Sequence, residues 1–307
     1  MESVVERINR YKQEFYRTYN FDKKSNLCNL IYLLEDYTGI YDQDFHKSVE
    51  NDRRRQEIMN HKRSVLSNRL KVFAKNNNDL IESIIEPYKV DYVPSEPYQE
   101  QYIDPNTCLK IVGDFLFSVS PYLYNAFCEL YQDNRVLISN RIHNGCEINV
   151  KRRDTIHIFS NSLCKVSDMA TLVHEMGHAY KDYLIPEYHE AYDIDDTLHS
   201  EISSMTLELM FIMCLINNRI YYDDAFKYFN FYENRIYSTS RCYSKNINLS
   251  IDKFRELSYL LGSICANNYA FEPNMSYDDF IRKIYFSNIR TILKYYNKNN
   301  KVKKFHF

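Results

Sequence analysis

The sequence predicts a mainly α-helical protein with a small β-sheet, and three observations lead to this fold class. Apolar residues recur at helical spacing along most of the 307-residue chain, beginning with Val4, Val5, Ile8, Tyr11 and Phe15. The chain contains only 5 glycines and 7 prolines, too few to punctuate an all-β sandwich or barrel. A hydrophobic fraction of 45% is sufficient for a folded core, which excludes disorder for most of the chain.

Strand candidates are confined to the middle of the chain. The candidates are residues 136–138 and 148–159, and in the second run β-branched and aromatic side chains cluster at residues 155–159, just before the polar pair Ser160-Asn161. Helical spacing resumes beyond this pair and continues to about Tyr296. We therefore expect a few short strands packed against helices.

A proline-rich stretch divides the chain into two predicted parts. Pro87, Pro94, Pro97 and Pro105 mark a connector between an N-terminal helical segment, residues 1–86, and a second unit, residues 87–297. The Lys- and Asn-rich end, residues 298–307, is predicted to be a frayed tail. We find no internal repeat.

The charge balance argues against nucleic acid or a membrane as a partner. The formal net charge is −2, from 39 Lys and Arg against 41 Asp and Glu. The basic triplet Arg53-Arg54-Arg55 lies among acidic residues, as on a solvated helix face. No run of about 18 uncharged apolar residues is present to span a membrane.

The cysteines indicate a reducing compartment. All 8 are scattered singly without C-x-x-C spacing, which argues against zinc ribbons and thioredoxin-like redox pairs. The first seven residues, MESVVER, have no apolar signal-peptide core. We therefore expect reduced thiols and a cytoplasmic location.

One segment carries a recognisable chemistry, His174-Glu175-Met176-Gly177-His178. On a helix, residues four apart lie on one face, so both imidazoles can bind a single zinc ion. Glu175 can then reach a water molecule at the metal as a general base. A merely structural pair of core histidines is less favoured, because two buried imidazoles beside a carboxylate are costly without a partner.

A catalytic zinc site usually has a third protein ligand. Lys181 and Leu184 stand where the metzincin motif requires Gly and His, so that class is excluded. A second helix begins near Thr197, and on it Glu201 and Glu208 are seven residues apart on one face. One of them can bind the metal while the other orients a ligand histidine. The competing third ligands are Glu187, His189, Glu190, Asp193, Asp195, Asp196 and His199.

These motifs resemble those of the oligoendopeptidase F and thimet oligopeptidase family of zinc peptidases, in the thermolysin-like (gluzincin) group. Its members carry H-E-x-G-H and, further along, E-x-x-S-x-x-x-E. The resemblance implies a short member with a catalytic domain of packed helices and one zinc ion per chain. It also implies that His174, His178 and Glu201 are the ligands, Glu175 is the base, and Glu208 orients a ligand histidine.

Weaker likenesses extend over roughly residues 105–269. Residues 144–146 and 156–161 resemble the family's segment for binding the substrate backbone, so we expect an edge strand. Its substrate-binding residues would be His157, Ile158, Phe159 and Ser160. Residues 254–270 resemble the helix that carries a tyrosine for transition-state stabilisation. Tyr259 is the preferred candidate, with Tyr243 and Tyr237 as alternatives.

The resemblance implies a zinc metallopeptidase that hydrolyses oligopeptides through a zinc-activated water. Two features depart from the family pattern: the N-terminal region is short, and residues 249–251 lack the histidine that precedes the family's catalytic tyrosine. The alternative is a catalytically degenerate zinc-binding protein that binds peptides or a partner. Intact Glu175 favours the enzyme.

Overall fold

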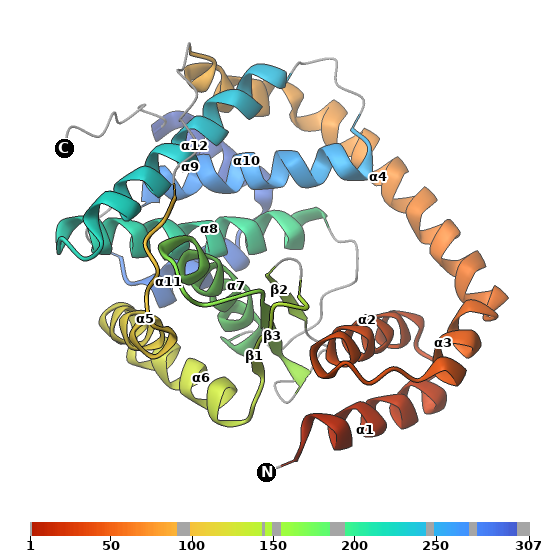
Figure 1. Cartoon of the computed structure of the whole chain (residues 1–307). Helices are drawn as coiled ribbons and strands as arrows, with labels where there is room; N and C mark the ends of the chain where they lie inside the picture. The colour runs from red at the N-terminus through yellow and green to blue at the C-terminus, as the bar shows by residue number, and fades with distance from the viewer. Residues whose placement is uncertain are drawn as a thin grey trace.

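The computed structural model is mainly helical with one three-stranded sheet (Figure 1), which confirms the predicted fold class. It describes residues 2–90, 99–142, 145–148, 155–184, 194–243, 249–269 and 275–299. The N-terminal helices are α1 (Val4–Arg17), α2 (Phe21–Thr38), α3 (Gln43–Glu50) and α4 (Arg53–Ile85), followed by the 3-10 turn η1 (Glu86–Tyr88). Next come α5 (Pro105–Val119), α6 (Pro121–Gln132), β1 (Val136–Ile138), β2 (Cys146–Ile148), β3 (His157–Ser160) and α7 (Val166–Leu184). The remaining helices are α8 (Ile194–Asn217), α9 (Tyr222–Cys242), α10 (Ile251–Tyr269), α11 (Tyr277–Tyr285) and α12 (Ile289–Asn299).

Helices α1 to α3 form a small bundle against the sheet (Figure 1). Ser3 and Glu6 make a capping box at the start of α1, which satisfies amide groups that the first helical turn leaves free. Gly39 ends α2 with a positive φ of 71°, a conformation that favours glycine. Tyr11, Phe15 and Phe45 are fully buried between these helices. The bundle therefore follows the amphipathic pattern of its sequence.

The sheet has the strand order β1-β3-β2, so β3 is its central strand. β1 pairs with β3 in parallel, and β2 pairs with it antiparallel. The prediction of an edge strand at His157–Ser160 is wrong, because neighbours occupy both sides of β3. All four of its residues are buried, so their side chains do not face a substrate.

His157 instead links α1 to the sheet through a hydrogen bond and a ring contact. Its Nδ1 donates to the Thr155 carbonyl at 2.9 Å, and Arg7 Nη1 donates to its Nε2 at 3.2 Å. The edge of the Tyr11 ring meets the imidazole with centroids 6.0 Å apart. Both ring nitrogens of a neutral imidazole are thereby used, which assigns the proton to Nδ1.

The burial of His157 predicts a loss of stability in acid. Burial, followed by the charge of Arg7, lowers the pKa of His157 from 6.5 to about 3. The unfolded chain therefore binds an extra proton between about pH 6.5 and 3, and the free energy of unfolding falls as pH falls through that window. Urea unfolding of His157→Gln should show a shallower pH dependence there. His61→Gln, an exposed position on α4, should keep the wild-type slope, and an equally steep slope in His157→Gln would contradict the assignment.

Three long helices form the layers that contain the chemical motif. α7 packs on the sheet, α8 packs on α7, and α10 packs on α8 (Figure 1). Two glycines allow these helices to approach closely. A Cβ on Gly177 of α7 would lie 2.6 Å from the Ser204 Cα of α8, and one on Gly262 of α10 would lie 3.0 Å from the Glu201 carbonyl oxygen. The contacts on both faces of α8 therefore meet near Glu201.

α8 is long and apolar enough to cross a membrane by length and composition alone, with a mean hydropathy of 1.3 over its most apolar window. However, 78% of that window is buried inside the fold. Such burial is typical of a core helix, and α8 carries both Glu201 and Glu208. The layers described above account for its apolar character.

The hydrophobic clusters do not follow the predicted boundary after residue 86. One cluster joins α1 to α3 with Leu137, Ile142 and Phe159. The larger cluster takes in α4 from Leu66 onward together with the helices after it. α4 thus begins beside the N-terminal bundle and continues into the packing of α10 and α12 (Figure 1). The predicted tail begins inside α12, and residues 300–307 lie outside the described part of the chain.

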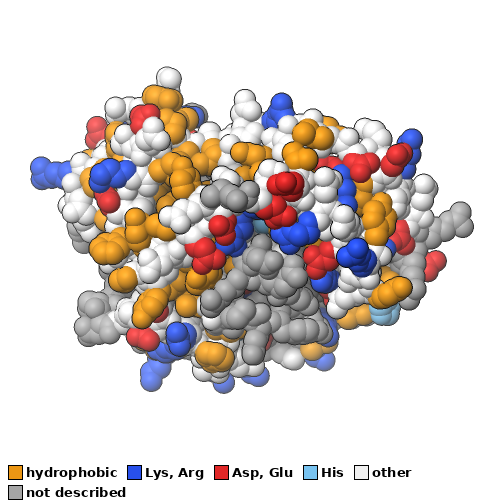
Figure 2. All heavy atoms as spheres, turned by 90° about the horizontal axis from the view of Figure 1, so that it is seen from below, with side chains coloured by type: hydrophobic (Ala, Val, Ile, Leu, Met, Phe, Trp, Pro, Cys, Tyr) orange, Lys and Arg blue, Asp and Glu red, His pale blue; other side chains and the backbone are white. Residues whose placement is uncertain are grey.

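Two further features are one face of the molecule and the cysteines. On the face seen from below in Figure 2, acidic and basic side chains are interspersed. All 8 cysteines lie in the described residues, and none forms a disulfide.

The glycine contact between α7 and α8 can be tested by stability. Gly177→Ala forces a methyl group against the Ser204 backbone, so we expect a loss of about 1–3 kcal/mol in the free energy of unfolding. Gly113→Ala on α5 is the matched control. Its added Cβ would lie 3.5 Å from the Tyr124 ring, an ordinary contact, and the gain in helix propensity should leave stability unchanged or up to about 1 kcal/mol higher. Equal urea midpoints for the two variants would contradict a tight contact at Gly177.

Candidate metal centre

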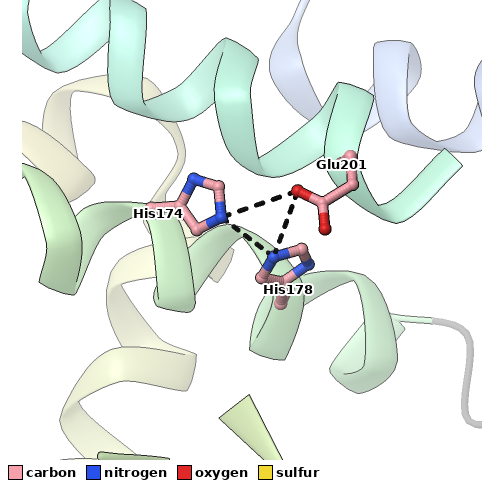
Figure 3. Close-up of side chains that lie close together, drawn as sticks. All are labelled: His174, His178 and Glu201. Carbon is pink, nitrogen blue, oxygen red and sulfur yellow. Dashed lines mark hydrogen bonds and ion pairs between the residues drawn. The ribbon is translucent and has the colours of Figure 1, made fainter. Parts of the chain in front are cut away.

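Two helices bring three potential ligands to one point. His174 and His178 project from α7, and Glu201 projects toward them from α8 (Figure 3). The two Nε2 atoms are 3.0 Å apart. Glu201 Oε2 lies 3.8 Å from Nε2 of His174 and 3.9 Å from Nε2 of His178. The three side chains form a largely buried group that could hold a metal ion.

The spacing and the unsatisfied oxygen of this group fit a metal. Tetrahedral bonds of 2.0–2.1 Å place neighbouring ligand atoms about 3.3 Å apart, close to the observed separations. Glu201 Oε2 is buried and has no hydrogen-bond partner. A buried carboxylate oxygen without a partner is costly, and a cation between it and the imidazoles would remove that cost.

Each histidine is held by a hydrogen bond at the ring nitrogen that faces away from Glu201. His174 Nδ1 donates to Glu208 Oε2 at 2.8 Å, and His178 Nδ1 lies 2.7 Å from Ser200 Oγ. The Tyr228 hydroxyl donates to the other oxygen of Glu208, also at 2.8 Å. With both protons assigned to Nδ1, the Nε2 lone pairs point to the shared position, as metal binding requires.

The electrostatics of the group favour a cation. Burial opposes the charged form of His174, but the hydrogen bond and charge of Glu208 raise its pKa to about 9. Burial, followed by the charge of His174, lowers the pKa of His178 well below its ordinary value. Burial also raises the pKa of Glu201 to about 7 and raises that of Glu175. Buried carboxylates therefore surround two imidazoles in a site shielded from water. A divalent ion bound there would be the largest local charge.

Glu175 lies beneath β2. The carboxylate accepts a hydrogen bond from the Glu147 backbone N–H. A Cβ on Gly145 would lie 3.3 Å from its Oε1 and 2.4 Å from Thr171 Cγ2, so the chain entering β2 passes directly over α7. The nearest edge of the sheet to this carboxylate is therefore β2.

Of the three candidate tyrosines, Tyr259 borders the metal group. Its ring centroid lies 6.4 Å from that of His174, and the Arg255 guanidinium donates a hydrogen bond to its hydroxyl oxygen. Burial raises the pKa of Tyr259. Tyr243 instead donates to Asn78 Oδ1 at 3.2 Å, and the Tyr237 ring stacks with Tyr88. Among the described residues, neither alternative has a ring contact with His174.

The competing third ligands lie elsewhere or outside the described residues. Asp196 accepts from Lys181 at 3.0 Å, and the His199 ring faces Tyr285. Asp195 lines a separate surface cavity between α4 and α12. Residues 187, 189, 190 and 193 lie in the segment that the structure leaves undescribed.

Sequence reasoning missed several contributors to the site. Tyr228 lies on α9 with no motif spacing to Glu208, so only the fold brings them together. Ser200 directly precedes the candidate ligand Glu201. That position is the one sequence feature that could have indicated a role for Ser200 in the site. Arg255 lies one helical turn before Tyr259, a spacing that places both side chains on one face.

Comparisons with known proteins give little further information. No family model matches the sequence, and no curated protein matches it. One solved structure, described as an oligoendopeptidase F from Bacillus anthracis str. Ames, is similar over 96% of this chain and 77% of its own. The TM-score is 0.45 and the sequence identity is 12%.

The hydrogen bonds behind the histidines should set the metal affinity. Ser200→Ala and Tyr228→Phe should each weaken Zn²⁺ binding about 10-fold or more, because partners of this kind orient the ligands. Competition with a chromogenic chelator measures the affinity. Ser118→Ala and Tyr232→Phe are the matched controls, since their hydroxyls donate to the backbone carbonyls of Phe115 and Ser263 and not to a ligand histidine or to Glu208, and they should bind Zn²⁺ as the wild type does. Equal affinities in all four variants would contradict the assignment.

Proposed function

We propose that the protein is a zinc-dependent peptidase that hydrolyses peptide bonds in oligopeptides. The observation that carries the proposal is the convergence of His174, His178 and Glu201, with Glu175 on the same helix as the two histidines. Two imidazoles and one carboxylate suit zinc better than magnesium or calcium, which prefer oxygen ligands. The proposal includes one zinc ion per chain.

A zinc ion held there would supply Lewis-acid chemistry, polarising a water molecule and the scissile carbonyl. Glu175 then acts as the proton carrier. Its carboxylate takes the proton of the attacking water and delivers it to the leaving amine. Burial, which raises the pKa of Glu175, suits a group that must both accept and release a proton.

Tyr259 is the proposed donor to the oxygen that becomes negative during attack. Arg255 can only donate, so the Tyr259 oxygen accepts from it and the tyrosine keeps its own proton for the substrate. A hydroxyl aimed at a developing negative charge in a dry site stabilises the transition state.

The position of the substrate follows from the corrected strand order. β2 is the edge strand next to Glu175 in the described sheet, so an extended peptide would pair with Cys146–Ile148. A cytoplasmic location belongs to the same proposal, because the 8 cysteines form no disulfide.

Glu175→Gln tests the mechanism. It should lower kcat for a quenched fluorescent peptide by about 100-fold or more, because the general base is lost, while zinc content by mass spectrometry stays at one per chain. Glu57→Gln, an exposed position on α4, is the matched control and should keep full activity.

A chelator should abolish wild-type cleavage, and added zinc should restore it. Unchanged activity in Glu175→Gln would contradict the assignment of the base. Wild-type protein that holds zinc but cleaves no peptide in a random library would replace the proposal with the degenerate peptide-binding alternative.

A further inference from the structure

Two arginines on neighbouring helices flank the ring of Tyr259. The guanidinium carbon of Arg235, on α9, lies 5.3 Å from the ring centroid, and that of Arg255, on α10, lies 5.9 Å from it. The same ring is 6.4 Å from the His174 ring. Each of these distances is shorter than the length of about two extended residues. A peptide whose scissile bond lies at the metal group can therefore reach either guanidinium within about four residues, two to the Tyr259 ring and two beyond it.

Neither arginine has an ion-pair partner in the described part of the chain. Both residues are exposed, and no carboxylate there lies in salt-bridge contact with either guanidinium. Glu201 and Glu175 attract Arg255 through space, but the proposed function commits both carboxylates to the metal and the proton. The guanidinium groups therefore keep donors available for a ligand.

Arg235 and Tyr259 open onto a cavity of about 340 Å³ between α9 and α10. Ser238, Thr239 and Ser263 add hydroxyl groups to its lining, and Glu256 adds one carboxylate. Arg235 is the cation in this lining, and Arg255 adds a second cation beside the Tyr259 ring that borders the cavity. The remaining lining includes Ile236 and Leu260, which can pack against the aliphatic part of a side chain.

We infer that this cavity is a substrate subsite that binds a peptide carboxylate through Arg235 and Arg255. A guanidinium pairs with a carboxylate through two parallel N–H donors, and an arginine held against an aromatic ring is already ordered for that geometry. The carboxylate is either the C-terminal group of the peptide or the side chain of Asp or Glu. The inference deepens the proposed function and rests on it for the position of the peptide.

Cleavage of matched peptides tests the subsite. Quenched fluorescent peptides would carry Glu or Gln at successive positions, each made with a free C-terminal acid or an amide. The wild type should cleave a carboxylate-bearing peptide with a kcat/KM about 10-fold or more above its neutral counterpart. Preference for the free acid over the amide would identify the C-terminal group, and preference for Glu over Gln at one position would identify a side chain.

Arg235→Gln should remove this preference by lowering kcat/KM for the carboxylate-bearing peptides about 10-fold or more, to the level of their neutral counterparts. Lys227→Gln is the charge-matched control on α9, because Lys227 lines a different cavity, and it should keep the preference. Arg235→Glu should reverse the preference toward peptides with Lys at the same position. Equal wild-type rates on charged and neutral peptides, or a preference that survives in Arg235→Gln, would overturn the inference.

Binding separates the failure of the inference from the failure of the proposed function. Fluorescence anisotropy of the same peptides, labelled with fluorescein, would be measured on zinc-loaded Glu175→Gln protein with and without Arg235→Gln. A carboxylate-dependent affinity that needs Arg235 supports the subsite even if the wild type cleaves no peptide, an outcome that would refute only the peptidase. Equal affinity for acidic and neutral peptides would refute the subsite even if cleavage occurs.

Discussion

The site depends on the close approach of α7 and α8. Gly177 lets α7 lie against the Ser204 backbone, one turn from Glu201, and no side chain larger than hydrogen fits there without displacing a helix. The two histidines of α7 and the carboxylate of α8 meet because of that contact. Gly262 plays the corresponding role on the other face of α8, where α10 brings Tyr259 beside His174. Helix packing thus sets the distances on which any metal chemistry relies.

The same packing buries several carboxylates close together, and their charges must be compensated. Burying Glu175, Glu201 and Glu208 around two imidazoles costs free energy unless the charges are compensated. Glu208 is satisfied from both sides, by His174 and Tyr228, whereas Glu201 keeps an oxygen without a partner. The group is therefore asymmetric: one carboxylate holds a histidine in place and the other has an open position for a cation.

Helical periodicity made the centre of the site predictable. Spacings of four and seven residues put His174 with His178, and Glu201 with Glu208, on single helix faces, and the structure brings these two pairs together. Strand order was not predictable in the same way. Three short strands can pair in several orders, and the burial of β3 depends on α1, whose Arg7 bonds to His157. Tyr228 and Arg235 also have no motif spacing, because α9 reaches the site only through tertiary packing.

The central claim is that His174, His178 and Glu201 bind one zinc ion, and zinc K-edge X-ray absorption on protein loaded with one equivalent tests it most directly. We expect a first shell of nitrogen and oxygen at about 2.0–2.1 Å with the outer-shell scattering of two imidazoles. His174→Ala should lose one of the two imidazoles. Sulfur at about 2.3 Å, which would mean that some of the 8 cysteines bind the metal instead, or a spectrum without imidazole scattering, would contradict the account.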